Sequence, residues 1–103
     1  MSRTYSNKLI DEVNKANPNR TGIALARACI NANLPAKYVA EALEVTRMSV
    51  YSWFRGKPVR DKNRQLIEVF TDLVESDTAK GILPAKSIAE AQAYIEGMIG
   101  RSI

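Results

Sequence analysis

The sequence predicts an all-α fold of five to six helices in a single domain. Apolar residues recur at helical spacing along most of the 103 residues, and no stretch alternates as a β-strand does. Hydrophobic residues make up 46% and charged residues 25%, as in average globular proteins. A chain of this length holds one core, so we expect a single domain. Within it we expect an N-terminal helical extension over 1–20, a core over 21–76 and a C-terminal helix over 77–103.

The N-terminal extension is predicted to carry one short, peripheral helix. Ser6 or Thr4 can cap it, because a short hydroxyl side chain accepts a hydrogen bond from a free amide of the first turn. Pro18 and the asparagines beside it end the helix. Its apolar face is Leu9, Ile10 and Val13.

A second helix is expected from residue 22 to about residue 32, with Thr21 as its cap. We expect Arg27 on its outer side and Cys29 as a small buried apolar residue. The inward stripe is Ile23, Ala26, Cys29 and Ile30. A third, brief helix follows over 36–43, a break covers 44–46, and a fourth helix runs from 47 to about 55. Gly56 suits the left-handed position that closes such a helix.

The last two helices are expected after a basic loop over 57–61. Asp61 can cap a helix from 62 to about 75, and the segment 76–81 breaks the pattern. Pro84 or Ser87 can start the final helix, which extends to about Met98. The apolar face of the first is Leu66, Val69, Phe70, Leu73 and Val74, and that of the second is Ile88, Ala91, Ile95 and Met98.

Two short helices joined by three residues, the second ending in glycine, are typical of a helix-turn-helix, which we place at about 36–55. Ala40 suits a close crossing of the two helices, and Thr46 can cap the second one. The inward set is Val39, Ala40, Leu43, Val45, Val50 and Trp53. The outward set is Arg47, Met48, Tyr51, Ser52 and Arg55.

The segment from 22 to about 74 resembles the DNA-binding domain of the Cro and lambda-repressor family of phage and bacterial regulators. The stretch RACINANL at 27–34 is similar to that family's first helix and turn, and VAEAL at 39–43 to its second helix. The stretch SVYSWFRG at 49–56 is similar to the end of its recognition helix. Where the family usually has a glycine in the turn, this chain has Glu44, which must take a strained backbone conformation.

The resemblance implies a sequence-specific double-stranded DNA-binding transcriptional regulator whose 47–55 helix enters the major groove. Arg47 can form two hydrogen bonds to guanine, and Met48 can pack on a thymine methyl group. The predicted base-contacting residues are Thr46, Arg47, Met48, Tyr51, Ser52 and Arg55. The predicted phosphate-contacting residues are Lys37, Lys57, Arg60, Lys62 and Arg64, with Arg55 beginning the same basic run.

Charge and composition support a binding module rather than an enzyme. The net charge is +4, and residues 1–64 hold twelve Lys/Arg against five Asp/Glu, whereas residues 65–103 hold three against six. With one cysteine and no histidine, the chain lacks the usual zinc ligand sets and histidine-based triads, so we expect no cofactor, metal or small-molecule ligand. No apolar run is long enough for a membrane span or a signal peptide, so we expect a cytoplasmic protein, phage or prophage encoded.

Several alternatives stay open at this stage. The C-terminal helix can form a homodimer, as in the family, or fold back on its own core. The helix pair also occurs in phage DNA-packaging (small terminase-like) subunits and recombination accessory proteins, and its outer face can instead bind protein in an adaptor or inhibitor. The basic run at 57–64 can be an ordinary solvated surface. Lys8 and Lys15 can also be ordinary surface charges, or they can belong to an N-terminal arm that contacts DNA.

Overall fold

The computed structural model describes residues 4–103, which form six helices and contain no strand. The predicted all-α fold is confirmed. Residues 1–3, the start of the extension expected over 1–20, lie outside the described residues. The helices are α1 (Asn7–Lys15), α2 (Thr21–Ala32), α3 (Ala36–Leu43), α4 (Arg47–Phe54), α5 (Asp61–Ala79) and α6 (Ile88–Ile99).

Hydroxyl side chains cap three of the helices. The Oγ atom of Ser6 accepts the Leu9 amide at 3.2 Å, and the Oγ atom of Ser87 accepts the Glu90 amide at 3.1 Å. Thr46 caps α4 in the same way, as predicted. The caps expected at Thr21 and Asp61 were wrong, because these residues are already the first residues of α2 and α5 and follow arginines that form no side-chain cap.

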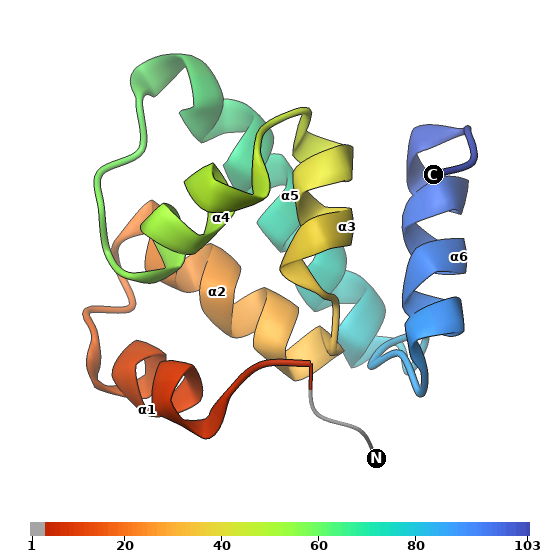
Figure 1. Cartoon of the computed structure of the whole chain (residues 1–103), viewed down its shortest axis with the longest axis horizontal. Coiled ribbons are helices and arrows are strands. Elements are labelled where there is room, and N and C mark those ends of the chain that lie inside the picture. The colour runs from red at the N-terminus through yellow and green to blue at the C-terminus, as the bar shows by residue number, and fades with distance from the viewer. Residues whose placement is uncertain (1–3) are drawn as a thin grey trace.

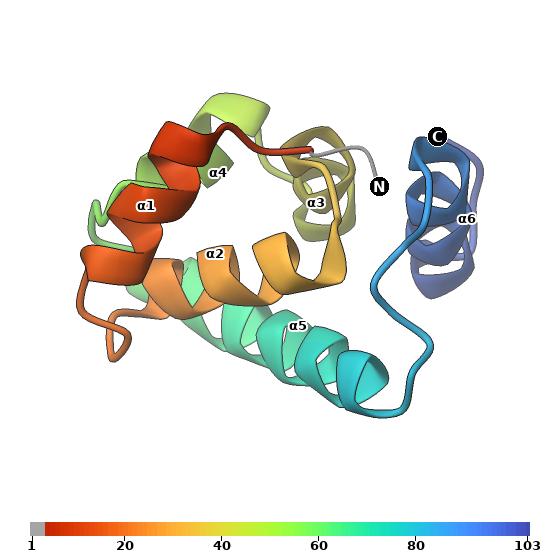
Figure 2. The ribbon, with the colours of Figure 1, turned by 90° about the horizontal axis from the view of Figure 1, so that it is seen from below.

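Helix α2 is at the centre of the core (Figure 1). It contacts α1, α4 and α5, while α3 contacts α4 on one side and α6 on another. Figure 2 shows α1 and α4 on one side of α2 and α5 on the opposite side, with α6 beside α3. The fold therefore presents α4 and α5 on opposite sides of the molecule.

The buried face of α5 is offset by one position along the chain from the predicted face. Leu66, Val69 and Leu73 were expected inside but are 49%, 58% and 43% exposed. The residues that face the core are Ile67, Phe70, Thr71 and Val74. The predicted and the observed stripe share Phe70 and Val74, and spacing alone does not choose between them. The break expected at 76–81 was also misplaced, since α5 continues to residue 79 and Gly81 follows with φ +82°.

Helix α1 contributes to the core and is more than the peripheral helix expected. Leu9 and Val13 are buried, and so is Tyr5 just before the helix. The Tyr5 ring lies 5.7 Å from the Phe54 ring, and its hydroxyl donates a hydrogen bond to the Leu34 carbonyl. The N-terminal segment is thus packed against the end of α4.

Arg27 of α2 was expected on the outside but is half-buried. Its Nη2 atom donates a hydrogen bond to the Asn14 carbonyl at 3.1 Å, while its Nε atom is buried with no hydrogen-bond partner among residues 4–103. The long aliphatic stem of arginine allows this, because it covers apolar surface while the charged head reaches the edge. This contact connects α2 to the end of α1.

The C-terminal helix folds back on the core of its own chain. Ala91 and Ile95 of α6 are fully buried, and the Tyr38 hydroxyl of α3 donates a hydrogen bond to Gln92 Oε1 at 3.3 Å. Ile88, expected in the same stripe, is 62% exposed. The Tyr94 hydroxyl donates a hydrogen bond to Asp77 Oδ2 at 2.6 Å, which ties α6 to the end of α5. Within residues 4–103, no helix is long and apolar enough to cross a lipid bilayer.

Candidate nucleic-acid interface

The pair formed by α3 and α4 has a three-residue connection over 44–46. Glu44 takes the left-handed conformation, with φ 56° and ψ 44°, as the sequence predicted for a non-glycine residue in this turn. The Val45 amide then donates a hydrogen bond to the Ala40 carbonyl at 3.1 Å. At the start of α4, Thr46 Oγ1 accepts the Ser49 amide at 3.1 Å. These local contacts fix where α4 begins and how it leaves α3.

One side of α4 is packed into the core. Val50 is fully buried, Trp53 is 7% exposed, and both belong to the predicted inward set. The rest of that set is Val39, Ala40 and Leu43, which are buried, and Val45, which is partly buried. Trp53 is therefore a core residue and is not free to stack on bases.

The other side of α4 is open. Four predicted base-contacting residues, which are Arg47, Met48, Tyr51 and Arg55, line a shallow hollow of about 490 Å³. Met48 is 79% exposed, whereas the Tyr51 ring is partly buried and meets the Phe54 ring edge-on at 6.1 Å. The structure therefore brings together one charged, one apolar and one aromatic side chain, with a second arginine at the helix end.

The remaining two base-contacting candidates lie outside that hollow. Thr46 is exposed at the start of α4, but its Oγ1 is also within 3.0 Å of Ser49 Oγ. Ser52 is half-buried. Neither residue lines the hollow as the other four do.

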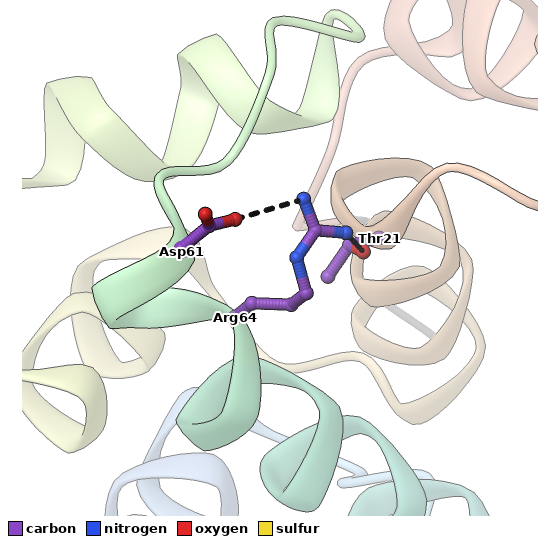
Figure 3. A network of polar contacts seen from close by, with 3 residues as sticks. All are labelled: Thr21, Asp61 and Arg64. Atoms are coloured by element: carbon purple, nitrogen blue, oxygen red, sulfur yellow. Dashed lines mark hydrogen bonds and ion pairs between the residues drawn. The ribbon is translucent and has the colours of Figure 1, made fainter.

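The five predicted phosphate-contacting residues are all exposed, but they are not equally free. Arg64 lies between two partners from different elements (Figure 3): its Nη1 atom donates to Thr21 Oγ1 at 3.3 Å and its Nη2 atom lies 3.6 Å from Asp61 Oδ1. Lys37 Nζ lies 5.8 Å from the centroid of the Tyr38 ring. Within residues 4–103, no ion pair holds Lys57, Arg60 or Lys62.

Arg20 is a basic residue near this surface that sequence reasoning missed. Its Nη1 atom donates a hydrogen bond to the Gly56 carbonyl at 2.7 Å. With Lys57 and Arg64 it lines a cleft of about 260 Å³ between the start of α2 and the loop after α4. The excess of positive charge in residues 1–64 indicated that further basic residues could belong to this surface. It did not single out Arg20, because Arg20 is far from α4 in the sequence.

The interface offers hydrogen-bond donors and positive charge rather than reactive groups. Cys29 is completely buried, and this burial raises the pKa of its thiol. In the part of the chain that the structure describes, no three acidic or cysteine side chains gather as metal ligands. The arrangement is suited to binding an anionic surface.

Comparisons with protein families, with curated proteins and with solved structures give no match to this chain. The features that bear on function are the exposed side of α4 and the cations around it. These features are properties of this chain's own residues. They define a basic helix surface on a packed support.

Proposed function

We propose that this protein is a sequence-specific double-stranded DNA-binding transcriptional regulator that inserts α4 into the major groove. The observation that carries the proposal is the outward set of exposed Arg47, Met48 and Arg55 with partly buried Tyr51, on a helix whose opposite side is buried. The major groove of B-DNA is about 12 Å wide and admits a helix. There, Arg47 pairs with a guanine edge and Met48 packs on a thymine methyl group.

The surrounding cations support the same proposal. Lys57, Arg60 and Lys62 follow α4 in the chain, and Lys37 lies in the first turn of α3. Such positions suit contacts to phosphates on the two sides of the groove. The resemblance of residues 22–74 to the Cro and lambda-repressor family adds to this argument. In that setting, the protein is phage or prophage encoded and occupies an operator in the cytosol.

The proposal includes binding as a homodimer to two-fold-related half-sites. A two-fold pairing of copies places two recognition helices about 34 Å apart along one face of DNA. Because α6 buries Ala91 and Ile95 in its own chain, pairing through the C-terminal helices relies on its outer residues, such as Ile88. The mass of the protein in solution tests this part: a dimer supports it, and a monomer or a ring contradicts it. A ring favours a packaging subunit instead.

Selection of bound duplexes from a random pool, followed by affinity measurements, tests the function itself. We expect one preferred sequence, and we expect Arg47→Ala to reduce the preference for it over random DNA by about 5- to 150-fold, the value of one bidentate contact. Lys80→Ala, an exposed cation at the end of α5, is the matched control and leaves the preference unchanged. Absence of duplex binding at low salt overturns the proposal and favours a protein-binding role for α4.

A further inference from the structure

Helix α1 and helix α4 lie on the same side of α2 (Figure 2). Residues of both helices line one cleft. This cleft has a volume of about 280 Å³. From α1 and the residues before it, Ser6, Lys8 and Glu12 line the cleft, and from α4, Tyr51 and Arg55 line it. Because Tyr51 and Arg55 also line the outward hollow of α4, the two depressions are adjacent.

The wall on the α1 side is held firmly in place. The Thr4 hydroxyl donates a hydrogen bond to Asn33 Oδ1 at 2.7 Å, and the buried Tyr5 contacts the Phe54 ring at the end of α4. Leu9 and Val13 anchor α1 itself in the core. The position of α1 beside α4 is therefore built into the core and does not need a ligand to form.

The charges in the cleft are unpaired. Lys8 and Arg55 are both exposed, and within residues 4–103 neither side chain has an ion pair or a hydrogen-bond partner. The acid that lines the cleft is Glu12, so the lining carries one net positive charge. The Ser6 hydroxyl accepts the Leu9 amide and retains its own proton for donation.

We propose that this cleft binds a phosphate group of the DNA strand that borders the groove occupied by α4. The inference depends on the proposed function, since a helix in the major groove has a phosphate backbone on each side. Lys8 and Arg55 contact the phosphate oxygens, and Ser6 donates a hydrogen bond to one of them. Glu12 opposes this binding, because its carboxylate repels the phosphate.

Three single variants of the full-length chain test this inference on the duplex selected with the wild type. Lys8→Ala is expected to weaken binding to specific and random duplexes by the same factor. It also reduces the slope of log K against log salt concentration by about 1, the value for one phosphate contact. Glu12→Gln is expected to raise the affinity for both duplexes.

Lys15→Ala is the matched control, because Lys15 is an exposed lysine of the same helix that does not line the cleft. It removes the same net charge and is expected to change the slope by much less than Lys8→Ala. Circular dichroism checks that each variant is folded. If the wild type binds DNA but Lys8→Ala and Lys15→Ala behave alike, the phosphate site is wrong and the proposed function stands. If the wild type binds no duplex DNA, both proposals fail.

Discussion

Gly22 of α2 lies directly against the backbone of Trp53 in α4. A Cβ atom on Gly22 would lie 2.5 Å from the Trp53 carbonyl oxygen and 3.0 Å from its carbonyl carbon. The two helices therefore approach each other at a point where one has no side chain. The orientation of α4 on the core, and with it the direction of its exposed side, depends on this contact.

Gly22→Ala is expected to lower the free energy of unfolding by about 1–3 kcal/mol or more, because backbone atoms must move apart. Gly97→Ala in α6 is the control. Apart from its chain neighbours and the backbone of α6, no atom of residues 4–103 lies within 4 Å of a Cβ there, and alanine is the better helix former by roughly 0.5–1 kcal/mol. Urea denaturation measures both variants. Effects of the same sign would contradict the close contact between α2 and α4.

Glu44→Gly is expected to raise the free energy of unfolding by about 0.5–1 kcal/mol, since the left-handed conformation costs an L-residue roughly 1–2 kcal/mol. Asn33 has the same φ of 56° and serves as the contrast. Its side chain donates a hydrogen bond to the Ala85 carbonyl at 2.8 Å and accepts one from Thr4, so Asn33→Gly loses both and is not expected to stabilise. Thermal unfolding of the two variants in parallel decides the point.

The position of the buried face of α5 can be tested with two neighbouring residues. Ile67 is 1% exposed, so Ile67→Ala is expected to cost about 2–5 kcal/mol of folding stability. Leu66 is 49% exposed, and Leu66→Ala is expected to cost about 0.5 kcal/mol or less. Chemical denaturation of both proteins gives the comparison. The reverse order would restore the face first predicted from the sequence.

Stability is expected to fall as the pH rises above about 9, where the unfolded chain releases the Cys29 proton that the buried thiol keeps, and to fall more steeply above about 10. Burial raises the pKa of Tyr5, and burial together with the hydrogen bond to Asp77 raises that of Tyr94. The unfolded chain releases these protons near pH 10 while the folded chain keeps them, so the unfolded state is favoured at higher pH. Tyr94→Phe should reduce this loss. Unfolding free energies measured from pH 8 to pH 11 show whether the slope flattens.

Under the proposed function, the double variant Lys57→Ala with Arg60→Ala is expected to reduce the salt slope of DNA binding by about 2. Arg64→Ala should have a smaller effect, because Arg64 lies beside Asp61 and Thr21 in the free protein. Fluorescence anisotropy at several salt concentrations measures both slopes. An unchanged slope in the double variant would show that these residues form only a solvated surface.

The sequence was most informative where local signals agree. The start of α4 was predicted from the cap at Thr46, and its end was predicted within one residue from Gly56 and the helical spacing of apolar residues. Caps and glycines act over only a few residues, so they can be read from the sequence. The buried face of α5 was predicted wrongly. Leu66 and Ile67 are both apolar, and only the packing against α2 determines which of them is buried. The contact of Arg20 with Gly56 was out of reach, because it depends on distant segments meeting in space. For Lys8 the sequence left a solvated charge and a DNA contact open, and only the fold places it in one cleft with Arg55.

The contact between Tyr5 and Phe54 affects which truncated fragments of this protein are useful in experiments. A fragment that starts at Thr21 keeps α2 to α6 and so contains the α3–α4 pair on which the proposed function depends. It would nonetheless remove the ring that covers Phe54, the last residue of α4, and the helix carrying Lys8. In such a fragment α4 would be less firmly packed, so weak DNA binding by it would say little about the proposed function of the intact chain.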